Sequence, residues 1–141
     1  MTIHLIKLSV GTQSVDGLRA WQKTVIERHL GTEFAGYHTH TTRMFPKRRE
    51  EILSGGSMYW VIGGQILVRQ QIADLVEVQT NEGRKCTIVL DPDLVLVNPT
   101  VRGPFQGWRY LQPQDAPGDL GLAGAEDDLP IRAELAELGL L

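Results

Sequence analysis

The spacing of hydrophobic positions changes several times along the chain, and each change marks an expected element. Residues 3–10, IHLIKLSV, are rich in apolar and β-branched side chains, which predicts a central strand. Residues 15–30 instead repeat apolar side chains every three or four positions, between a typical N-cap at Ser14 and a stop at Gly31. This second pattern predicts an amphipathic helix, and we expect Trp21 to pack in the core.

Residues 41–72 combine a basic cluster, a short helix and a hairpin, and we expect the rest of the chain to be organised around them. Residues 37–43 alternate and are rich in threonine, so they are expected to be extended. A short helix over residues 46–53 follows, because proline suits a first helical turn and Gly55-Gly56 suits a left-handed C-cap.

The hairpin that follows is predicted by two apolar runs, residues 57–62 and 65–78, on either side of Gly63-Gly64. Two glycines allow the positive φ angles of a two-residue turn. The second run is long for one strand, so we expect a bend or bulge near Ala73 or Asp74.

The remaining pattern predicts further short strands over residues 85–90, 94–97 and 108–111, and a last helix over residues 130–138 that is capped by Asp127-Asp128. We therefore expect an α+β protein whose sheet is mostly antiparallel and curls into a partly closed barrel, with two or three flanking helices. We assign residues 1–120 to a single domain and residues 121–141 to an acidic tail.

Composition favours an ordinary globular protein, since 42% of the 141 residues are hydrophobic and 22% are charged. No run approaches the roughly 20 apolar residues of a membrane-spanning helix, and the N-terminus lacks the pattern of a signal peptide. A single cysteine, Cys86, excludes an internal disulfide and fits a reducing compartment. We therefore expect a cytoplasmic protein without a membrane partner.

The net charge of −3 is distributed unevenly. From Gln114 onward there are seven acids and one base, which gives −6, so the preceding part has 13 bases against 10 acids, or +3. A basic body is typical of proteins that bind polyanions. The alternative is that the acidic tail folds onto the basic surface and neutralises it.

Several segments resemble a bacterial domain-of-unknown-function family, numbered 1489: HLIKL near the start, RMFPKR, SGGSMYWVIGG with the following RQQI, and FQGWRYLQPQDAP. The resemblance extends to about residue 120 and implies no activity. A looser likeness is to the small PUA and ASCH β-barrels, in which a helix leads into a glycine-aspartate signal and a hairpin carries an arginine. Here Gly56-Ser57 replaces that signal, and Arg69 is the arginine. This likeness implies binding of RNA or modified nucleotides.

The candidate binding residues are cations and one aromatic that surround the predicted hairpin and follow it. Arginine binds phosphate oxygens bidentately, and exposed aromatics stack on bases. The alternative is a solvated face in which each arginine has a local carboxylate partner. The set comprises Arg43, Lys47, Arg48, Arg49, Arg69, Arg102, Trp108 and Arg109.

Other groups of residues give weaker indications of a chemical function. His38 and His40 face the same side of an expected strand, but no third metal ligand is placed beside them, so a half-exposed strand without a metal is the preferred interpretation. Cys86 lies in an apolar strand, where its pKa is raised and its reactivity is low. No nucleophile elbow or phosphate loop is present. We therefore assign no catalytic residue, no metal and no cofactor.

Three functional hypotheses follow from the sequence. The first is an RNA- or nucleotide-binding module that uses the basic and aromatic surface. The second is a protein-interaction domain or homodimer in which Trp60, Trp108 and Arg109 anchor the interface. The third and weakest is a small-molecule enzyme with its site in a barrel cleft.

Overall fold

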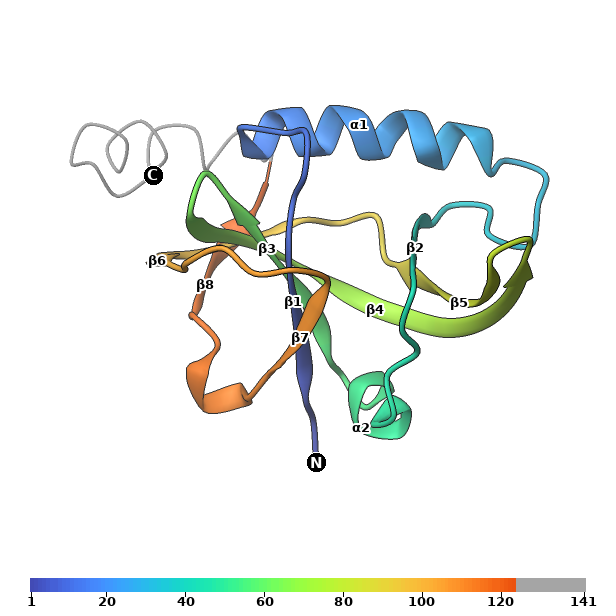
Figure 1. Cartoon of the computed structure of the whole chain (residues 1–141). Coiled ribbons are helices and arrows are strands. Elements are labelled where there is room, and N and C mark those ends of the chain that lie inside the picture. The colour runs from blue at the N-terminus through green and yellow to red at the C-terminus, as the bar shows by residue number, and fades with distance from the viewer. Residues whose placement is uncertain (124–141) are drawn as a thin grey trace.

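The computed structural model describes residues 1–123, which form eight strands, two α-helices and one 3-10 helix (Figure 1). The strands are β1 (His4–Leu8), β2 (His38–Thr42), β3 (Ser57–Ile62), β4 (Gln65–Thr80), β5 (Gly83–Leu90), β6 (Val95–Val101), β7 (Trp108–Leu111) and β8 (Asp119–Leu122). The helices are α1 (Val15–Arg28), α2 (Arg49–Leu53) and η1 (Pro113–Asp115). The α+β class expected from the sequence is confirmed, and the expected last helix over residues 130–138 lies outside the described residues.

The strands form one mixed sheet in the order β2-β5-β4-β3-β1-β7, with β6 paired to β4 and β8 paired to β6. Only the β1–β3 pairing is parallel among the described strands. The end strands β2 and β7 do not pair with each other in residues 1–123, so the sheet is not closed into a barrel, and the likeness to PUA and ASCH barrels is not confirmed. Instead of a strand ladder, the segment after β2 contacts β7, where Trp108 Nε1 donates to the Met44 carbonyl at 3.0 Å.

The longest strand, β4, belongs to two parts of the sheet. Its first half lies between β3 and β6, and its second half pairs with β5. The pairing register with β5 shifts between Ile72 and Asp74, which confirms the predicted bend near Ala73. The turn before β4 is also confirmed, because Gly63 and Gly64 have φ angles of 60° and 83°.

The basic segment before α2 differs from expectation. The helix begins at Arg49 rather than Pro46, so Lys47 and Arg48 precede it. The backbone N–H groups of Lys47 and Arg48 donate to the Tyr110 hydroxyl at 3.0 and 3.3 Å. These bonds tie the segment to β7, and the helix that follows is five residues long.

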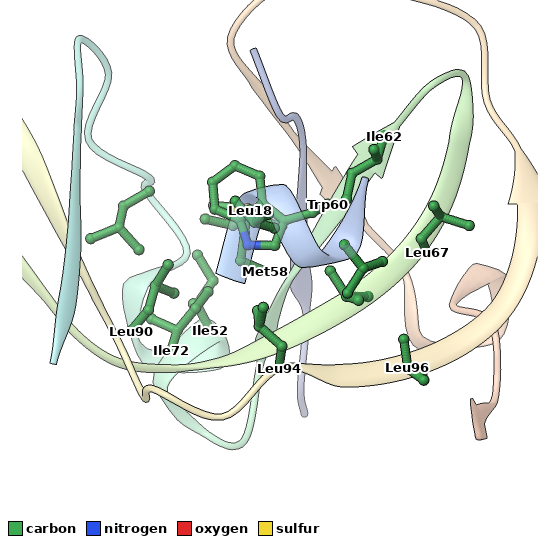
Figure 2. Packing of buried hydrophobic residues seen from close by; sticks show 14 of the residues in the cluster. Leu18, Ile52, Met58, Trp60, Ile62, Leu67, Ile72, Leu90, Leu94 and Leu96 are labelled. Atoms are coloured by element: carbon green, nitrogen blue, oxygen red, sulfur yellow. The ribbon is translucent and has the colours of Figure 1, made fainter. Parts of the chain in front are cut away.

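Two apolar clusters fill the two faces of the sheet, and β3 contributes to both of them. All six of its residues are buried, with Trp60 in the larger cluster and Tyr59 in the smaller one. Both aromatic residues of β3 therefore belong to the core. Figure 2 shows Leu18 of α1 beside Met58 and Trp60, where the helix packs on the larger cluster.

The face that α1 buries differs from the expected apolar stripe. The buried positions are Val15, Leu18, Gln22 and Val25, whereas Trp21 is 50% exposed. The prediction that Trp21 packs in the core is therefore wrong. A glutamine occupies the inward position because its amide has partners in the core, and the indole of Trp21 stacks outside against Arg28, whose guanidinium lies 5.4 Å from the ring centroid.

Candidate functional site

Three of the sequence-predicted cations are bound to acids within the fold. Arg48 pairs with Glu51 one turn along the chain. Arg49 pairs with Asp74 at 2.8 Å, and its Nε donates to the Leu75 carbonyl at 3.3 Å. For these two residues and for Arg69, the structure fits the alternative of local neutralisation.

The pair formed by Arg69 and Asp119 has the most defined geometry of these ion pairs. Nε and Nη2 of Arg69 donate to the two carboxylate oxygens at 2.7 Å each, and Nη1 donates to the Ser57 hydroxyl at 3.1 Å. The bidentate bond lowers the pKa of Asp119 and raises that of Arg69. Asp119 is one of the seven acids counted from Gln114 onward, and it folds onto the basic body.

Two other cations meet at the edge strand β7. A groove of about 410 Å³ lies between the segment after β2 and the start of β7. The first side contributes Arg43 and Met44, and the second contributes Gln106, Trp108 and Arg109. We call it the β7 groove. The Trp108 indole is fixed there by its bond to the Met44 carbonyl and by an edge-to-face contact with Tyr110, 5.0 Å between centroids.

Phe105 holds two arginines beside this edge of the sheet. Arg102 and Arg109 lie over its ring, with guanidinium carbons 5.2 and 5.7 Å from the centroid. Phe105 itself packs on the smaller apolar cluster, which gives the two arginines a fixed platform. Within residues 1–123, no carboxylate lies at ion-pair distance from Arg43, Arg102 or Arg109, and the same holds for Lys47.

The structure thus separates the predicted set into residues that are paired with acids and residues that lie near β7. The paired group is Arg48, Arg49 and Arg69, and the group near β7 is Arg43, Lys47, Arg102, Trp108 and Arg109.

Sequence reasoning missed Met44 and Gln106, which carry no charge and gave no signal in the pattern. It also had no means of pairing Arg69 with an acid fifty positions away.

The two histidines of β2 line a second hollow, which we call the histidine pocket. It has a volume of about 100 Å³ and is bordered by Lys7, His38, His40, Trp60 and Trp21. His38 is 4% exposed, so the expectation of a half-exposed strand is wrong at this position. Both rings face the core because they lie opposite Leu90 and Ile88 of β5.

The pKa of each histidine in this pocket is lowered to about 4, mainly because burial disfavours the charged ring. Repulsion from neighbouring groups adds to this effect: the protonated forms of His40 and His29 disfavour protonation of His38, and Lys7 disfavours protonation of His40. No group of three potential metal ligands is found among residues 1–123. No carboxylate is among the described residues that line the pocket.

Cys86 and Ser57 are both buried in this fold. Cys86 is fully buried, and burial raises its pKa to about 11, which confirms the expected unreactive core thiol. Ser57 is 1% exposed, and its hydroxyl oxygen accepts a hydrogen bond from Nη1 of Arg69.

Comparison with known proteins gives family membership and no activity. A family model described as a protein of unknown function matches residues 5–141. This match confirms the family resemblance inferred from the sequence and extends it through the acidic tail. No curated protein and no solved structure matches the chain. In the described part of the chain, no helix is long and apolar enough to cross a membrane.

Proposed function

Because the chain belongs to the DUF1489 family, whose description names no activity, we propose a function from its own surface: it binds single-stranded RNA or nucleotides in the β7 groove. One observation carries the proposal. Arg43, Arg109 and Trp108 line the same groove, and no carboxylate in residues 1–123 neutralises either arginine.

The chemistry of the groove suits a nucleotide. Guanidinium groups bind phosphate oxygens through two parallel hydrogen bonds, and indole rings stack on bases for about 1–3 kcal/mol per base. The groove volume of about 410 Å³ falls within the roughly 300–1,000 Å³ that is usual for ligand sites. Arg102 and Arg109 on Phe105 continue the positive surface along the backbone path of a longer strand.

The proposed site is smaller than the one expected from the sequence. Arg48, Arg49 and Arg69 are excluded from it, because each would have to leave a carboxylate before it could bind phosphate. Lys47 stays at the margin, since its exposed side chain has no carboxylate partner within residues 1–123.

Fluorescence anisotropy with a labelled single-stranded RNA of twelve nucleotides tests the proposal. Arg43→Ala and Arg109→Ala should each weaken binding about tenfold, the usual cost of a lost phosphate contact, and should reduce the salt slope by about one. Arg84→Ala is the matched control, because Arg84 is equally charged but is paired with Glu77 on the β4–β5 hairpin. Equal losses for all three variants, or no binding at low salt, would refute the proposal.

A second candidate, association between copies at the same face, is favoured by the exposure of Met44 and Phe45, which are 66% and 37% exposed. Trp60 takes no part in it, because this side chain is 3% exposed. Sedimentation at several concentrations separates the two candidates. A monomer at all concentrations excludes the second, and an Arg109-dependent dimer that does not bind RNA excludes the first.

A further inference from the structure

The histidine pocket is separate from the β7 groove and brings several nitrogen groups into a confined space. Lys7 of β1 is the register partner of Trp60 of β3, so their side chains leave the sheet on the same face. His40 of β2 approaches that indole from the other side of the pocket, with the ring centroids 5.7 Å apart. His38 lies two residues away on the same face of β2.

One polar atom of a residue that lines this pocket has no hydrogen-bond partner. Nδ1 of His38 is fully buried and is bonded to no atom of the described chain. Buried polar atoms are nearly always bonded, because an unmet donor or acceptor costs about 1–3 kcal/mol. The neighbouring side chains of β5, Ile88 and Leu90, are apolar and cannot supply the partner. This unmet bond and the lining of the pocket are the two observations from which a ligand can be argued.

The charges around the pocket identify the kind of occupant. Lys7 is the charged residue of β1 that lines it, His38 and His40 come from β2, and α1 contributes only Leu18 and Trp21 to its wall. His29, the residue after α1, disfavours protonation of His38 when its own ring is charged, and its Nε2 is hydrogen-bonded to the Thr39 hydroxyl at 2.8 Å. No acid is among the described lining residues. This surrounding repels cations and attracts anions.

We propose that the histidine pocket binds a small oxyanion, a phosphate or a carboxylate group, between Lys7, His38 and His40. Lys7 supplies the charge, and each neutral imidazole supplies one N–H, because a neutral ring always keeps one donor. The oxyanion accepts from Nδ1 of His38 and so provides the bond that the fold leaves unmade. The proposal does not depend on RNA binding in the β7 groove.

Protonation and oxyanion binding in this pocket favour each other. A bound anion stabilises the charged imidazole, so it raises the pKa values of His38 and His40 above their unliganded values of about 4. Conversely, affinity for the anion increases as the pH is lowered toward those values. A water molecule in the same place would produce neither effect.

The test is an NMR titration of the histidine rings in the full chain, with inorganic phosphate and with acetate, each compared with sodium chloride at equal ionic strength. At least one oxyanion should shift the His38 and His40 signals saturably in the millimolar range and raise both pKa values by about one unit or more. His4 is the internal control, because it lies outside the pocket and accepts from the backbone N–H of Ser57 at 3.0 Å. Absence of saturation with both anions would overturn the proposal.

The same titration on variants tests whether the ammonium group of Lys7 binds the oxyanion. Lys7→Met keeps the apolar stem and removes the ammonium, and it should abolish the saturable shift, whereas Arg43→Ala and Arg109→Ala should leave it intact. An unchanged shift in Lys7→Met would overturn the proposal, and so would its loss in the groove variants. If Lys7→Met does not fold, the pKa comparison in the unmodified chain decides the question alone.

Discussion

The side-chain amides of Gln22 and Gln70 bond to each other in both directions inside the core. Nε2 of Gln22 donates to Oε1 of Gln70 at 2.9 Å, and Nε2 of Gln70 donates back to Oε1 of Gln22 at 2.7 Å. Gln70 also accepts from Trp60 Nε1 at 3.1 Å and donates to the Asp91 carbonyl at 2.8 Å. A single amide thus joins α1, β3 and the turn after β5.

The first prediction concerns this network. Gln70→Leu should lower the free energy of unfolding by about 2 kcal/mol or more, because it strands several buried polar groups that each cost about 1–3 kcal/mol. The double variant Gln22→Leu/Gln70→Leu should lose less than the sum of the two single variants, because it removes both amides of the pair. Urea denaturation of all four proteins measures this coupling, and strict additivity would contradict it.

The second prediction concerns the junction between α2 and β3. A Cβ atom at Gly56 would lie 2.4 Å from the carbonyl oxygens of both Ile3 and Ile52, and neither backbone can move away freely. Gly56→Ala should therefore destabilise the fold by about 2 kcal/mol or more. Gly103→Ala is the control, because a Cβ there meets nothing within 4 Å. Thermal unfolding should separate the two variants, and equal melting temperatures would refute the account.

The third prediction concerns acid stability in a phosphate-free buffer. The unfolded chain protonates histidine near the usual pKa of 6.5, whereas His38 and His40 in the fold resist protonation until about pH 4. The contribution of these histidines to the free energy of unfolding is therefore fully present above pH 6.5. It falls as the pH drops toward 4, by up to about 1.4 kcal/mol per pH unit for each histidine. His4, whose pKa is also lowered, adds in the same direction.

Urea denaturation at intervals between pH 4 and pH 7 measures this dependence. His40→Asn should flatten the slope between pH 5 and pH 6.5, a range in which the carboxylates remain ionised. A slope that is identical in the variant would show that His40 is not the source.

The fourth prediction concerns Cys86, the single thiol of the chain. Its complete burial and a pKa near 11 leave almost no accessible thiolate at neutral pH. A chromogenic disulfide reagent should therefore react only after the addition of denaturant. Stoichiometric reaction of the native protein within minutes would contradict the packing of β5.

Much of the fold follows from local pattern. Alternation and β-branched residues predicted β3, β4 and β5, and paired glycines predicted the turn between β3 and β4, because a strand and its turn depend mainly on adjacent residues. The strand β8, Asp119–Leu122, was missed because DLGL is short and contains glycine, so only its pairing with β6 makes it a strand.

The candidate site was harder to predict, because it depends on contacts between residues that are far apart in the sequence. Whether an arginine is available depends on which acid reaches it, and Asp119 lies far along the chain from Arg69. Likewise, the inward place of Gln22 depends on an amide of β4. Sequence pattern gives the type of each side chain, whereas its partner is decided by strand pairing between distant segments.

The position of β1 between β3 and β7 has a consequence for the growing chain. Both strands that pair with β1 follow it in the sequence, so β1 is synthesised before either β3 or β7 is available to it. Leu5 and Ile6, both fully covered in the finished sheet, stay exposed in the interval. Until β3 is synthesised, β1 therefore presents apolar side chains and unpaired backbone groups, which makes this strand prone to wrong pairing and aggregation during translation.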